Sequence, residues 1–433
     1  MGKGTLKAPG GGLGGAIVAI GISIVPLILV MTVSDGMIEG ITRRYIETKS
    51  HHMQIGLPLG PSAEIAAAAI PALKALPGVA AAYLERDGTA VAVSGSRSHA
   101  ILARALPADY FLDPGTGRFL TALEGNPIPS GSRGMVIGSA LAQALAVGLG
   151  DLLTVVTPGA EADDTAQYLG SGYAPRLSTF RITGIVSAGY RDLDALWAFI
   201  SPEAGDRILS YPSSTAFIGL KVENPYGGEL GGEIRNKVGD AMKGLYPQWF
   251  EDYLVRTWPE LEQSLYANFG TTKTMLLFIM AIILLVAAVN LGSALSTFVA
   301  ERTMEIAVLR SLGASDRTIG GIFTGAGLLA GAVGTILGVG AGLLLAVNIN
   351  PLIRWVEWIV NAGDATLSRL AGRPALPLKL LDPGYYLEAI PLVVDFKSVA
   401  MVVAASLVLS VAVSLLPSRR AVRISVQDLI RKS

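Results

Sequence analysis

Four long apolar runs constrain this chain of 433 residues more than any other feature. A helix needs about 20 predominantly apolar residues to cross the core of a bilayer. The sequence offers such runs at residues 13–33, 273–299, 318–348 and 398–416. None carries a charge at its centre, where burial in lipid would be costly. Charged residues make up only 16% of the chain, against roughly 25% in soluble domains. We therefore expect four transmembrane helices.

The first run has a second interpretation, because Lys3 and Lys7 precede it as they would precede a signal peptide. Its apolar part is longer than the roughly 7–15 residues of a signal-peptide core, and no A-x-A-like cleavage site follows it. Pro26 lies in mid-span, where a membrane helix tolerates a kink. These features favour a retained transmembrane helix preceded by a short tail, residues 1–12.

The basic residues predict the orientation of the spans. Four spans place residues 1–12, 300–317 and 417–433 on one side of the membrane, and these segments hold Lys3, Lys7, Arg302, Arg310, Arg317, Arg419, Arg420, Arg423, Arg431 and Lys432. Short loops rich in Lys and Arg stay cytoplasmic. We therefore expect both termini inside, with residues 34–272 and 349–397 outside. Trp355 and Trp358 follow the third run, where an interfacial aromatic belt would place them.

The large outside segment, residues 34–272, is predicted to be a mixed α+β domain. A strand–helix–strand pattern precedes and follows a strand-rich block at about residues 95–212. This order predicts one subdomain interrupted by another. Within it, the pair Asp87-Gly88 is typical of a two-residue hairpin turn, so we expect two short strands joined there.

The sequence offers no set of catalytic residues. Cysteine is absent, which excludes disulfides and thiolate chemistry. The only adjacent histidines are His51 and His52, and adjacent residues of a strand face opposite sides, so they would form a poor metal chelate. No phosphate-binding Walker A loop, H-E-x-x-H or G-x-S-x-G motif occurs. A net charge of zero provides no basic field for nucleic acid. We expect no metal, no cofactor held by this chain and no nucleic-acid partner.

One long loop within the outside domain is a candidate contact site. It lies between the strands expected at residues 152–156 and 178–186 and reads "TPGAEADDTAQYLGSGYAPRL". Loops of this length are usually functional or disordered. Two interpretations stay open, an unstructured loop and a protruding arm that contacts another protein. The candidate contact residues are Pro158, Tyr168, Leu169, Tyr173 and Pro175.

A charged stretch, "ERTMEIAVLRSLGAS", separates the second and third runs. On a helix over residues 301–312, Glu301 and Glu305 share one face, whereas Met304 and Val308 belong to a less polar face. Gly313 is suited to close this helix at its C′ position. The helix lies either in the lipid headgroups or in the groove of a protein partner. Acidic residues are unfavourable beside an anionic inner leaflet, which favours the protein groove. Such a helix fits a membrane subunit driven by a separate ATPase.

Several segments resemble a known family. The core "RTMEIAVLRSLGAS" and the glycine-rich third run resemble ABC-transporter permeases of the MacB/FtsX type. The segments "VMTVSDGMIEGITRRYIETKSHHMQI" and "DPGYYLEAIPLVVDFKSV" are similar to the LolC/LolE subunits of lipoprotein-releasing systems. The resemblance implies a Porter-like outside domain that is interrupted by a Sabre-like insertion at about residues 95–212.

The resemblance also implies a function and a set of partners. The chain would be a non-catalytic inner-membrane permease that extracts lipoproteins from the outer leaflet and passes them to a LolA-like periplasmic carrier. LolD-like ATPase subunits would bind ATP and Mg, and a second copy or a paralogue would complete the transporter among the membrane lipids. Two alternatives stay open, a MacB-like mechanotransmission efflux permease and an FtsX-like regulator of cell-wall hydrolases.

The same resemblance implies three groups of site residues in this sequence. The coupling helix that receives the stroke of the ATPase would use Glu301, Arg302, Met304, Glu305, Val308, Arg310 and Leu312. A cavity for the acyl chains of the substrate would be lined by Ile24, Leu27, Ile28, Met31, Met275, Phe278, Ile279 and Ile282. The loop from Pro158 to Pro175 would contact the carrier.

Overall fold

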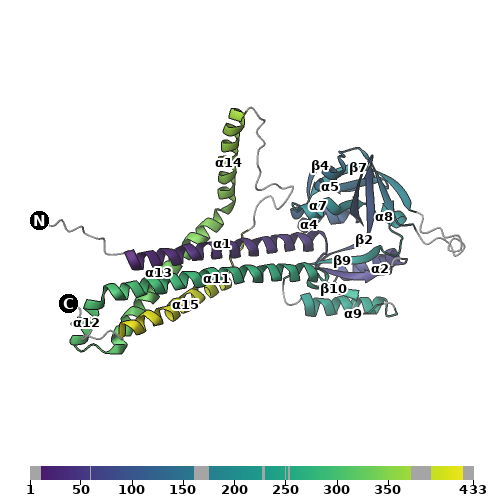
Figure 1. Ribbon diagram of the computed structural model, residues 1–433. Coiled ribbons are helices and arrows are strands. Elements are labelled where there is room, and N and C mark those ends of the chain that lie inside the picture. Colours follow the sequence, from purple (N-terminus) through teal and green to yellow (C-terminus); the bar gives the residue numbers. More distant parts are fainter. Residues whose placement is uncertain are drawn as a thin grey trace, which may run out of the picture. The chain divides into compact units, whose positions relative to one another are not determined.

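The computed structural model describes residues 11–58, 60–159, 175–226, 230–248, 250–251, 254–371 and 392–422. The chain divides into two compact units (Figure 1). The helical unit comprises Met1–Glu39, Ala267–Leu378 and Ile390–Ser433, and the α/β unit comprises Gly40–Tyr266 and Lys379–Ala389. The predicted fold class is confirmed, because a large α+β domain separates the first two of four apolar helices. The tail expected at residues 1–12 lies mainly outside the described residues. Of the tail expected at residues 417–433, the first six residues belong to the last helix and residues 423–433 lie outside the described residues.

The helical unit contains α1 (Gly11–Thr48), α11 (Gln263–Glu301), α12 (Thr303–Ser311), α13 (Asp316–Val347), α14 (Ile349–Ala371) and α15 (Phe396–Val422). Within the described part of the chain, α1, α11, α13 and α15 are the four helices long and apolar enough to cross a membrane. Both α1 and α11 exceed the span length, and each continues into the α/β unit. Helix α14 lies where the sequence indicated only an outside loop, at residues 349–397.

Glycines of α13 allow this helix to pack closely against α1. Gly334, Gly338 and Gly342 recur at every fourth position, so they share one face of α13. A Cβ atom at Gly338 would lie 2.8 Å from both the Gly21 carbonyl oxygen and the Ile24 Cβ. Small residues let membrane helices approach at backbone distance, where packing rather than water-driven burial holds them together. The glycine-rich character of the third run therefore serves helix packing.

A second small-residue face of α13 packs against α15. A Cβ at Gly331 would lie 2.3 Å from Ser410 Oγ, and one at Gly327 would lie 2.5 Å from Ser414 Cβ. A buried hydrogen bond of 2.8 Å joins Thr335 Oγ1 to the hydroxyl of Ser406 on α15. The helix α13 is thus packed on two sides by neighbouring spans.

An ion pair joins α1 and α11 where their apolar runs end. Lys273 Nζ lies 2.5 Å from Asp35 Oδ1. These residues border the apolar runs expected at residues 13–33 and 273–299. Charged side chains near the ends of spans reach the membrane interface at little cost. The pair therefore marks one boundary of the apolar core.

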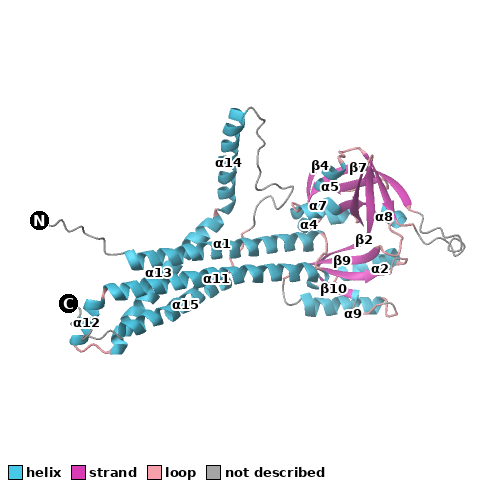
Figure 2. Cartoon of the chain, in the orientation of Figure 1, coloured by secondary structure: helices cyan, strands magenta, loops and turns pink. Residues whose placement is uncertain are grey.

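The α/β unit contains a ten-stranded sheet with the order β10-β1-β9-β2-β3-β8-β5-β7-β4, in which β6 pairs with β2 and β7 (Figure 2). The strands are β1 (Met53–Leu57), β2 (Val79–Ser94), β3 (Arg97–Ala105), β4 (Thr121–Gly125), β5 (Gly134–Gly138), β6 (Leu152–Thr157), β7 (Arg176–Ser187), β8 (Trp197–Ile200), β9 (Thr215–Val222) and β10 (Val255–Thr257). The helices are α2 (Ser62–Lys74), α3 (Ala108–Leu112), α4 (Pro114–Phe119), α5 (Ser139–Leu145), α7 (Arg191–Leu196), α8 (Pro202–Ile208), η1 (Leu230–Ile234), α9 (Arg235–Leu245) and α10 (Trp258–Leu261).

The α/β unit contains three apolar cores, one of which includes Tyr83, Trp197 and Phe199. Before the insertion the chain runs β1-α2-β2 and after it β9-α9-β10, and α2 and α9 pack with these strands around one core. Strands β2, β3, β8, β5, β7 and β6 pair in a closed cycle around the second core. Each of these six strands contributes inward-pointing apolar residues, for example Ala92, Ala103, Ala198, Ile137, Phe180 and Val155. A closed cycle leaves no free edge among these strands.

Strand β2 contributes to all three cores, and it corrects one expectation. Its residues 79–87 pair with β9 and its residues 86–94 pair with β3, so one strand joins the interrupted subdomain to the inserted block. The hairpin turn predicted at Asp87-Gly88 is wrong, because the strand continues through both residues and turns at Gly95, whose φ is +57°. Residue 88 is glycine because of packing and not because of a turn, since a Cβ there would lie 2.3 Å from Tyr211 Oη.

Candidate functional site

The short helix α12 is anchored by one buried face. Ile306 and Ala307 are buried. Ile306 packs in one cluster with Val299 of α11, with Ile319 and Phe323 of α13, and with Ala421 of α15. The helix is shorter than the expected 301–312. Glu301 is the last residue of α11, Arg302 precedes the first turn, and Leu312 follows the last. Burial of one face holds α12 against the ends of three spans.

The opposite face of α12 presents an exposed apolar stripe. Met304, Val308 and Leu312 are 67%, 53% and 79% exposed, and their spacing of four places them in one row. Charge borders the row, because Arg302 Nη1 donates to Glu305 Oε1 at 2.5 Å and both side chains are exposed. An apolar row on a short helix with charged borders is the geometry that docks in a protein groove.

The end of α12 is fixed by a Schellman motif, which confirms the expected role of Gly313. This glycine has a φ of +93°. The Ala314 N–H donates to the Leu309 carbonyl and the Gly313 N–H to the Arg310 carbonyl, both at 3.0 Å. Arg310 also forms an ion pair with Asp316 of α13 at 2.5 Å. Arg310 therefore takes part in holding α12 in place, in addition to bordering its surface.

The structure separates the residues expected to line an acyl-chain cavity into two groups. On α1, Ile24, Leu27 and Ile28 are buried in the core of the helical unit, and Met31 is partly buried beside them. On α11, the expected residues are all exposed, namely Met275, Phe278, Ile279 and Ile282. Burial thus divides the eight residues into a packed group on α1 and an exposed group on α11. The exposed apolar surface of α11 is the part that is free to contact lipid.

The expected contact loop lies mostly outside the described residues, which include its two ends. Tyr168, Leu169 and Tyr173 are not described, whereas Pro158 and Pro175 are described and exposed. The flanking strands β6 and β7 are antiparallel partners, and Thr157 pairs with Arg176 at the end of the ladder. The loop thus leaves and re-enters the domain from two adjacent strands.

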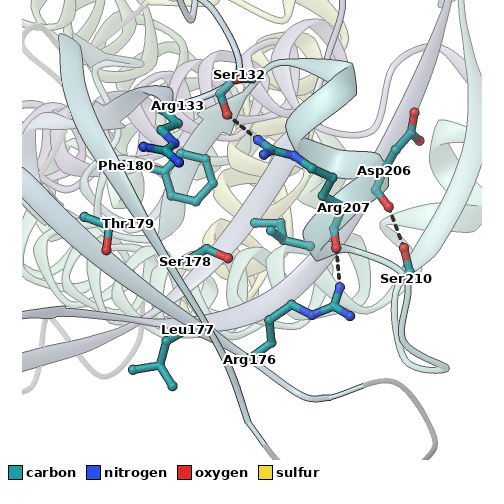
Figure 3. A pocket seen from close by; sticks show the side chains of 11 residues that line it. Ser132, Arg133, Arg176, Leu177, Ser178, Thr179, Phe180, Asp206, Arg207 and Ser210 are labelled. Carbon is teal, nitrogen blue, oxygen red and sulfur yellow. Dashed lines mark hydrogen bonds between the residues drawn. The ribbon is translucent and has the colours of Figure 1, made fainter.

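A basic pocket of about 800 Å³ lies beside the first residues of β7 (Figure 3). Three arginines line it, Arg133, Arg176 and Arg207. Arg207 Nη2 donates to the Ser132 carbonyl at 2.6 Å, and Arg176 donates to the Arg207 carbonyl. Within the described part of the chain, none of the three forms an ion pair with a carboxylate. The pocket therefore offers positive charge to an anionic partner.

The C-terminal end of α1 is held inside the α/β unit by buried polar groups. The Thr48 carbonyl accepts hydrogen bonds from Arg104 Nη1 and from the Tyr110 hydroxyl, both at 2.6 Å. Terminal carbonyls of a helix lack partners within the helix and carry partial negative charge. A buried guanidinium and a phenol thus replace water at the end of a helix that begins among the membrane spans.

Arg104 is itself held by a buried carboxylate. Its Nε and Nη2 donate to the two oxygens of Glu85 at 2.5 and 3.0 Å. His51 Nε2 lies 2.8 Å from the same carboxylate. We call Arg104, Glu85, His51 and Tyr110 the stalk-end cluster. All four side chains are buried.

Burial determines the protonation of the cluster. Burial alone would raise the pKa of Glu85, but Arg104 and His51 hold it below its usual value. Burial lowers the pKa of His51, which outweighs the opposing effect of the Glu85 contact. We therefore assign a neutral imidazole that donates its Nε2 proton to Glu85. His51 Nδ1 has no hydrogen-bond partner among the residues that the structure describes.

A second group of charges fixes the last turn of α1. Lys221 Nζ donates to Asp113 Oδ2 at 2.5 Å, to Thr116 Oγ1 at 2.8 Å and to Glu47 Oε2 at 3.1 Å. His52 accepts from the Val222 N–H at 2.8 Å and contacts Glu47 Oε1 at 3.1 Å. The two histidines therefore contact different carboxylates, Glu85 and Glu47.

Neither cluster of buried charges is predicted from the sequence. A signal was present in the strands, where Glu85 interrupts "AAAYLERDG" and Arg104 interrupts "AILARAL". Long charged residues are seldom fully buried unless they are paired. A charge at an inward position of an apolar strand therefore calls for a partner, but only the strand register shows which one.

Comparison with known proteins agrees with this architecture. The MacB-like periplasmic core domain matches residues 14–225, and the FtsX-like permease C-terminal domain matches residues 277–426. The lipoprotein-releasing system transmembrane protein LolC of Neisseria meningitidis is 28% identical over 298 residues, covering 69% of this chain and 64% of that protein. LolE of Haemophilus influenzae is 27% identical over 293 residues, covering 67% of this chain and 62% of that protein.

The matched segments span less than two thirds of the length of these curated relatives. Among solved structures, the periplasmic region of MacB from Actinobacillus actinomycetemcomitans aligns with a TM-score of 0.32 and 13% identity, covering 50% of this chain and 94% of that one. The MacB-like match covers the first span and most of the α/β unit. The FtsX-like match covers the three later spans. The chain therefore carries a MacB-like periplasmic core domain followed by an FtsX-like permease C-terminal domain, and it is a multi-pass membrane protein with a large periplasmic domain, similar to LolC and LolE.

Proposed function

We propose that this chain is the membrane subunit of an ATP-driven transporter that extracts lipoproteins from the outer leaflet of the inner membrane and passes them to a periplasmic carrier. The exposed row on α12 is the observation that carries the proposal. Met304, Val308 and Leu312 face outward, while the buried Ile306 anchors the helix to the ends of three spans. A partner ATPase with bound ATP and Mg would dock on this row, and a push there would reach α11 and α13.

The substrate class is inferred from the lipoprotein-releasing relatives and from the apolar surface of the spans. Each acyl CH₂ group that leaves a membrane costs about 0.8 kcal/mol, so moving a lipid anchor needs ATP and an apolar acceptor. A charge-free surface suits an anchor that stays in apolar surroundings. The exposed side chains of α11 are the best candidates to contact the acyl chains, and these are Met275, Phe278, Ile279 and Ile282.

The proposal places the termini and α12 in the cytoplasm and the α/β unit in the periplasm. Because α1 and α11 are continuous helices that enter the α/β unit, movement of either span would reach that unit without a polar pore. The loop from Pro158 to Pro175 would contact the carrier. The adjacent arginine pocket favours an acidic carrier surface. A second permease subunit, identical or paralogous, would complete the transporter.

Co-purification tests the proposal. The chain is purified with its ATPase in the absence of nucleotide, and the bound molecules are identified by mass spectrometry. We expect acylated lipoproteins, and fewer of them when Phe278 and Ile282 are replaced by Ser. Recovery of a cell-wall hydrolase or of an efflux-duct component, without lipoprotein, would instead support an FtsX-like regulator or a MacB-like efflux permease.

A further inference from the structure

Helix α14 (Ile349–Ala371) is amphipathic along its described length. Its polar residues recur with the spacing of one helix face, at Asn350, Arg354, Glu357, Asn361, Asp364 and Ser368. Its apolar residues occupy the opposite face, at Ile349, Leu352, Ile353, Val356, Ile359 and Val360. Residues three and four apart on a helix share a face, so the two sets form two separate stripes.

The apolar stripe is not covered by the described part of this chain. Leu352, Val356, Ile359 and Val360 are 37–42% exposed, which is high for aliphatic side chains that share one face. Trp355, at the border of the stripe, is 59% exposed. A contiguous apolar face of this kind marks a contact with a membrane or with another protein.

The position of α14 in the chain indicates which contact. Only Asn348 separates α14 from α13, a candidate span, so α14 begins where α13 leaves the bilayer. Helix α12 lies at the other end of α13, so α12 and α14 belong to opposite membrane surfaces. Within the helical unit, α14 turns away from the direction of α13 and points out to the side of the spans (Figure 1). A helix that turns sideways where a span ends lies along the membrane surface.

We propose that α14 lies in the lipid interface of the membrane surface opposite α12, with its apolar stripe in the acyl-chain boundary. The occupant of the stripe is bilayer lipid, because α14 follows the candidate span α13 after a single residue and therefore begins at the surface of the bilayer. Interfacial helices insert their apolar face below the headgroups and keep their polar face in water. Trp355 borders the stripe at headgroup depth, where tryptophan is favoured.

The charges of α14 indicate the lipid class. Arg354 on the polar face is accompanied by Glu357 and Asp364, so this face is not strongly basic. Anionic lipids attract basic clusters, and α14 has none. The helix therefore binds a zwitterionic surface through buried apolar area. This inference concerns the membrane position of α14 and does not depend on the transported substrate.

The absence of cysteine permits a direct test by single-cysteine labelling of the full chain. Val356→Cys and Val360→Cys report the apolar stripe, and Arg354→Cys and Asn361→Cys report the polar face. Each variant is labelled with an environment-sensitive fluorophore and reconstituted in phosphatidylethanolamine-rich vesicles. Quenching is compared between lipids that carry a spin label near the headgroup and iodide in the water. Leu329→Cys, exposed within α13, and Glu64→Cys, exposed on α2, are the lipid and water controls.

We expect labels at 356 and 360 to be quenched several-fold more by the lipid than by iodide, and labels at 354 and 361 to show the reverse. Equal iodide quenching at all four positions would overturn the proposal, because α14 would then stand in water. Protection of 356 and 360 from both quenchers, with cross-linking between copies at these cysteines, would assign the stripe to a second copy and also overturn it.

Discussion

Arg104 and Glu85 form a two-point ion pair in the interior of the α/β unit, with donor–acceptor distances of 2.5 and 3.0 Å. The same guanidinium donates to the Thr48 carbonyl at the end of α1. One side chain thus connects a helix that begins among the spans with two strands of the domain. Because both charges are buried, each depends on the other for its compensation.

Replacing Arg104 with Met should therefore destabilise the α/β unit by about 3–5 kcal/mol, since it leaves Glu85 as an uncompensated buried charge. The measurement is the thermal unfolding of the full chain in detergent. Arg133→Met is the matched control, because Arg133 is exposed and outside the cluster. Similar melting temperatures for the two variants would show that the pair does not hold this joint.

The buried His51 predicts a specific dependence of stability on pH. Its pKa is lowered in the folded protein, whereas an unfolded histidine titrates near about 6.5. Above that pH both states are neutral and the stability is fully present. Below it the unfolded chain takes up a proton that folded His51 resists, so stability falls by up to about 1.4 kcal/mol per pH unit.

The measurement compares melting temperatures at about pH 7.5 and about pH 5.5, on either side of the unfolded pKa. His51→Gln should lower the melting temperature at the higher pH and reduce the difference between the two values. His99→Gln is the control, because His99 lies near the surface and contacts the carbonyl oxygen of the neighbouring Ala100. A pH difference that persists in His51→Gln would assign the titration to another group.

The glycine face of α13 predicts a contrast between two neighbouring substitutions. Gly338→Ala should destabilise the helical unit by about 1–3 kcal/mol, because the added methyl overpacks the contact with α1. Gly340→Ala should be neutral or slightly stabilising, since a Cβ there meets no atom within 4 Å and alanine favours the helix. Thermal unfolding in detergent measures both. Equal effects would contradict the close packing of α13 on α1.

Reversing one charge on α12 should weaken the docking of the ATPase. Glu305→Lys places a positive charge beside the exposed row of Met304 and Val308 while leaving the buried anchor intact, so membrane insertion should be normal. Pull-down of the ATPase by the full chain measures the effect, and we expect a loss of about tenfold or more. Glu64→Lys, the same change on an exposed residue of α2, should bind normally. Normal recruitment by Glu305→Lys would remove α12 from the interface.

Arg310→Glu needs a different interpretation from Glu305→Lys. Because Arg310 pairs with Asp316 at 2.5 Å, this variant should also disturb the position of α12 itself. A loss of docking in Arg310→Glu is therefore expected, but Glu305→Lys is the more specific probe of the surface.

The loop between β6 and β7 predicts a separable effect on the carrier. Deleting residues 161–172 should abolish cross-linking to the periplasmic carrier, because the proposed contact residues lie in and around this segment. Recruitment of the ATPase by the same variant should be unchanged, which serves as the internal control. Unchanged carrier cross-linking would leave the loop without the proposed role.

Local patterns predicted the elements whose structure depends on local chemistry. The four spans follow from apolar length, and the end of α12 follows from Gly313. The same kind of pattern failed at Asp87-Gly88, where a turn dipeptide lies within a continuous strand because Gly88 must pack on Tyr211. The polar and apolar residues of α14 have the spacing of an amphipathic helix. The sequence-based expectation for this segment was nevertheless an outside loop, with its tryptophans in an interfacial belt.

Non-local contacts explain what the sequence did not predict. The partners Glu85 and Arg104 are 19 residues apart and meet only through the register of β2 and β3. The burial of Ile24 and Ile28 depends on the glycine face of α13, so the spans cannot be divided into lipid-facing and packed residues from α1 alone. Register and helix contacts are properties of the assembled fold.

ATP-driven release of a lipoprotein from vesicles tests the central claim most directly. The chain and its ATPase are reconstituted with a fluorescent acylated lipoprotein, and transfer to a soluble carrier is followed after ATP is added. We predict release that requires ATP, the carrier and an intact α12 surface, so Glu305→Lys should abolish it. Lipoprotein that stays in the vesicles while the wild-type complex hydrolyses ATP and binds the carrier would contradict the claim.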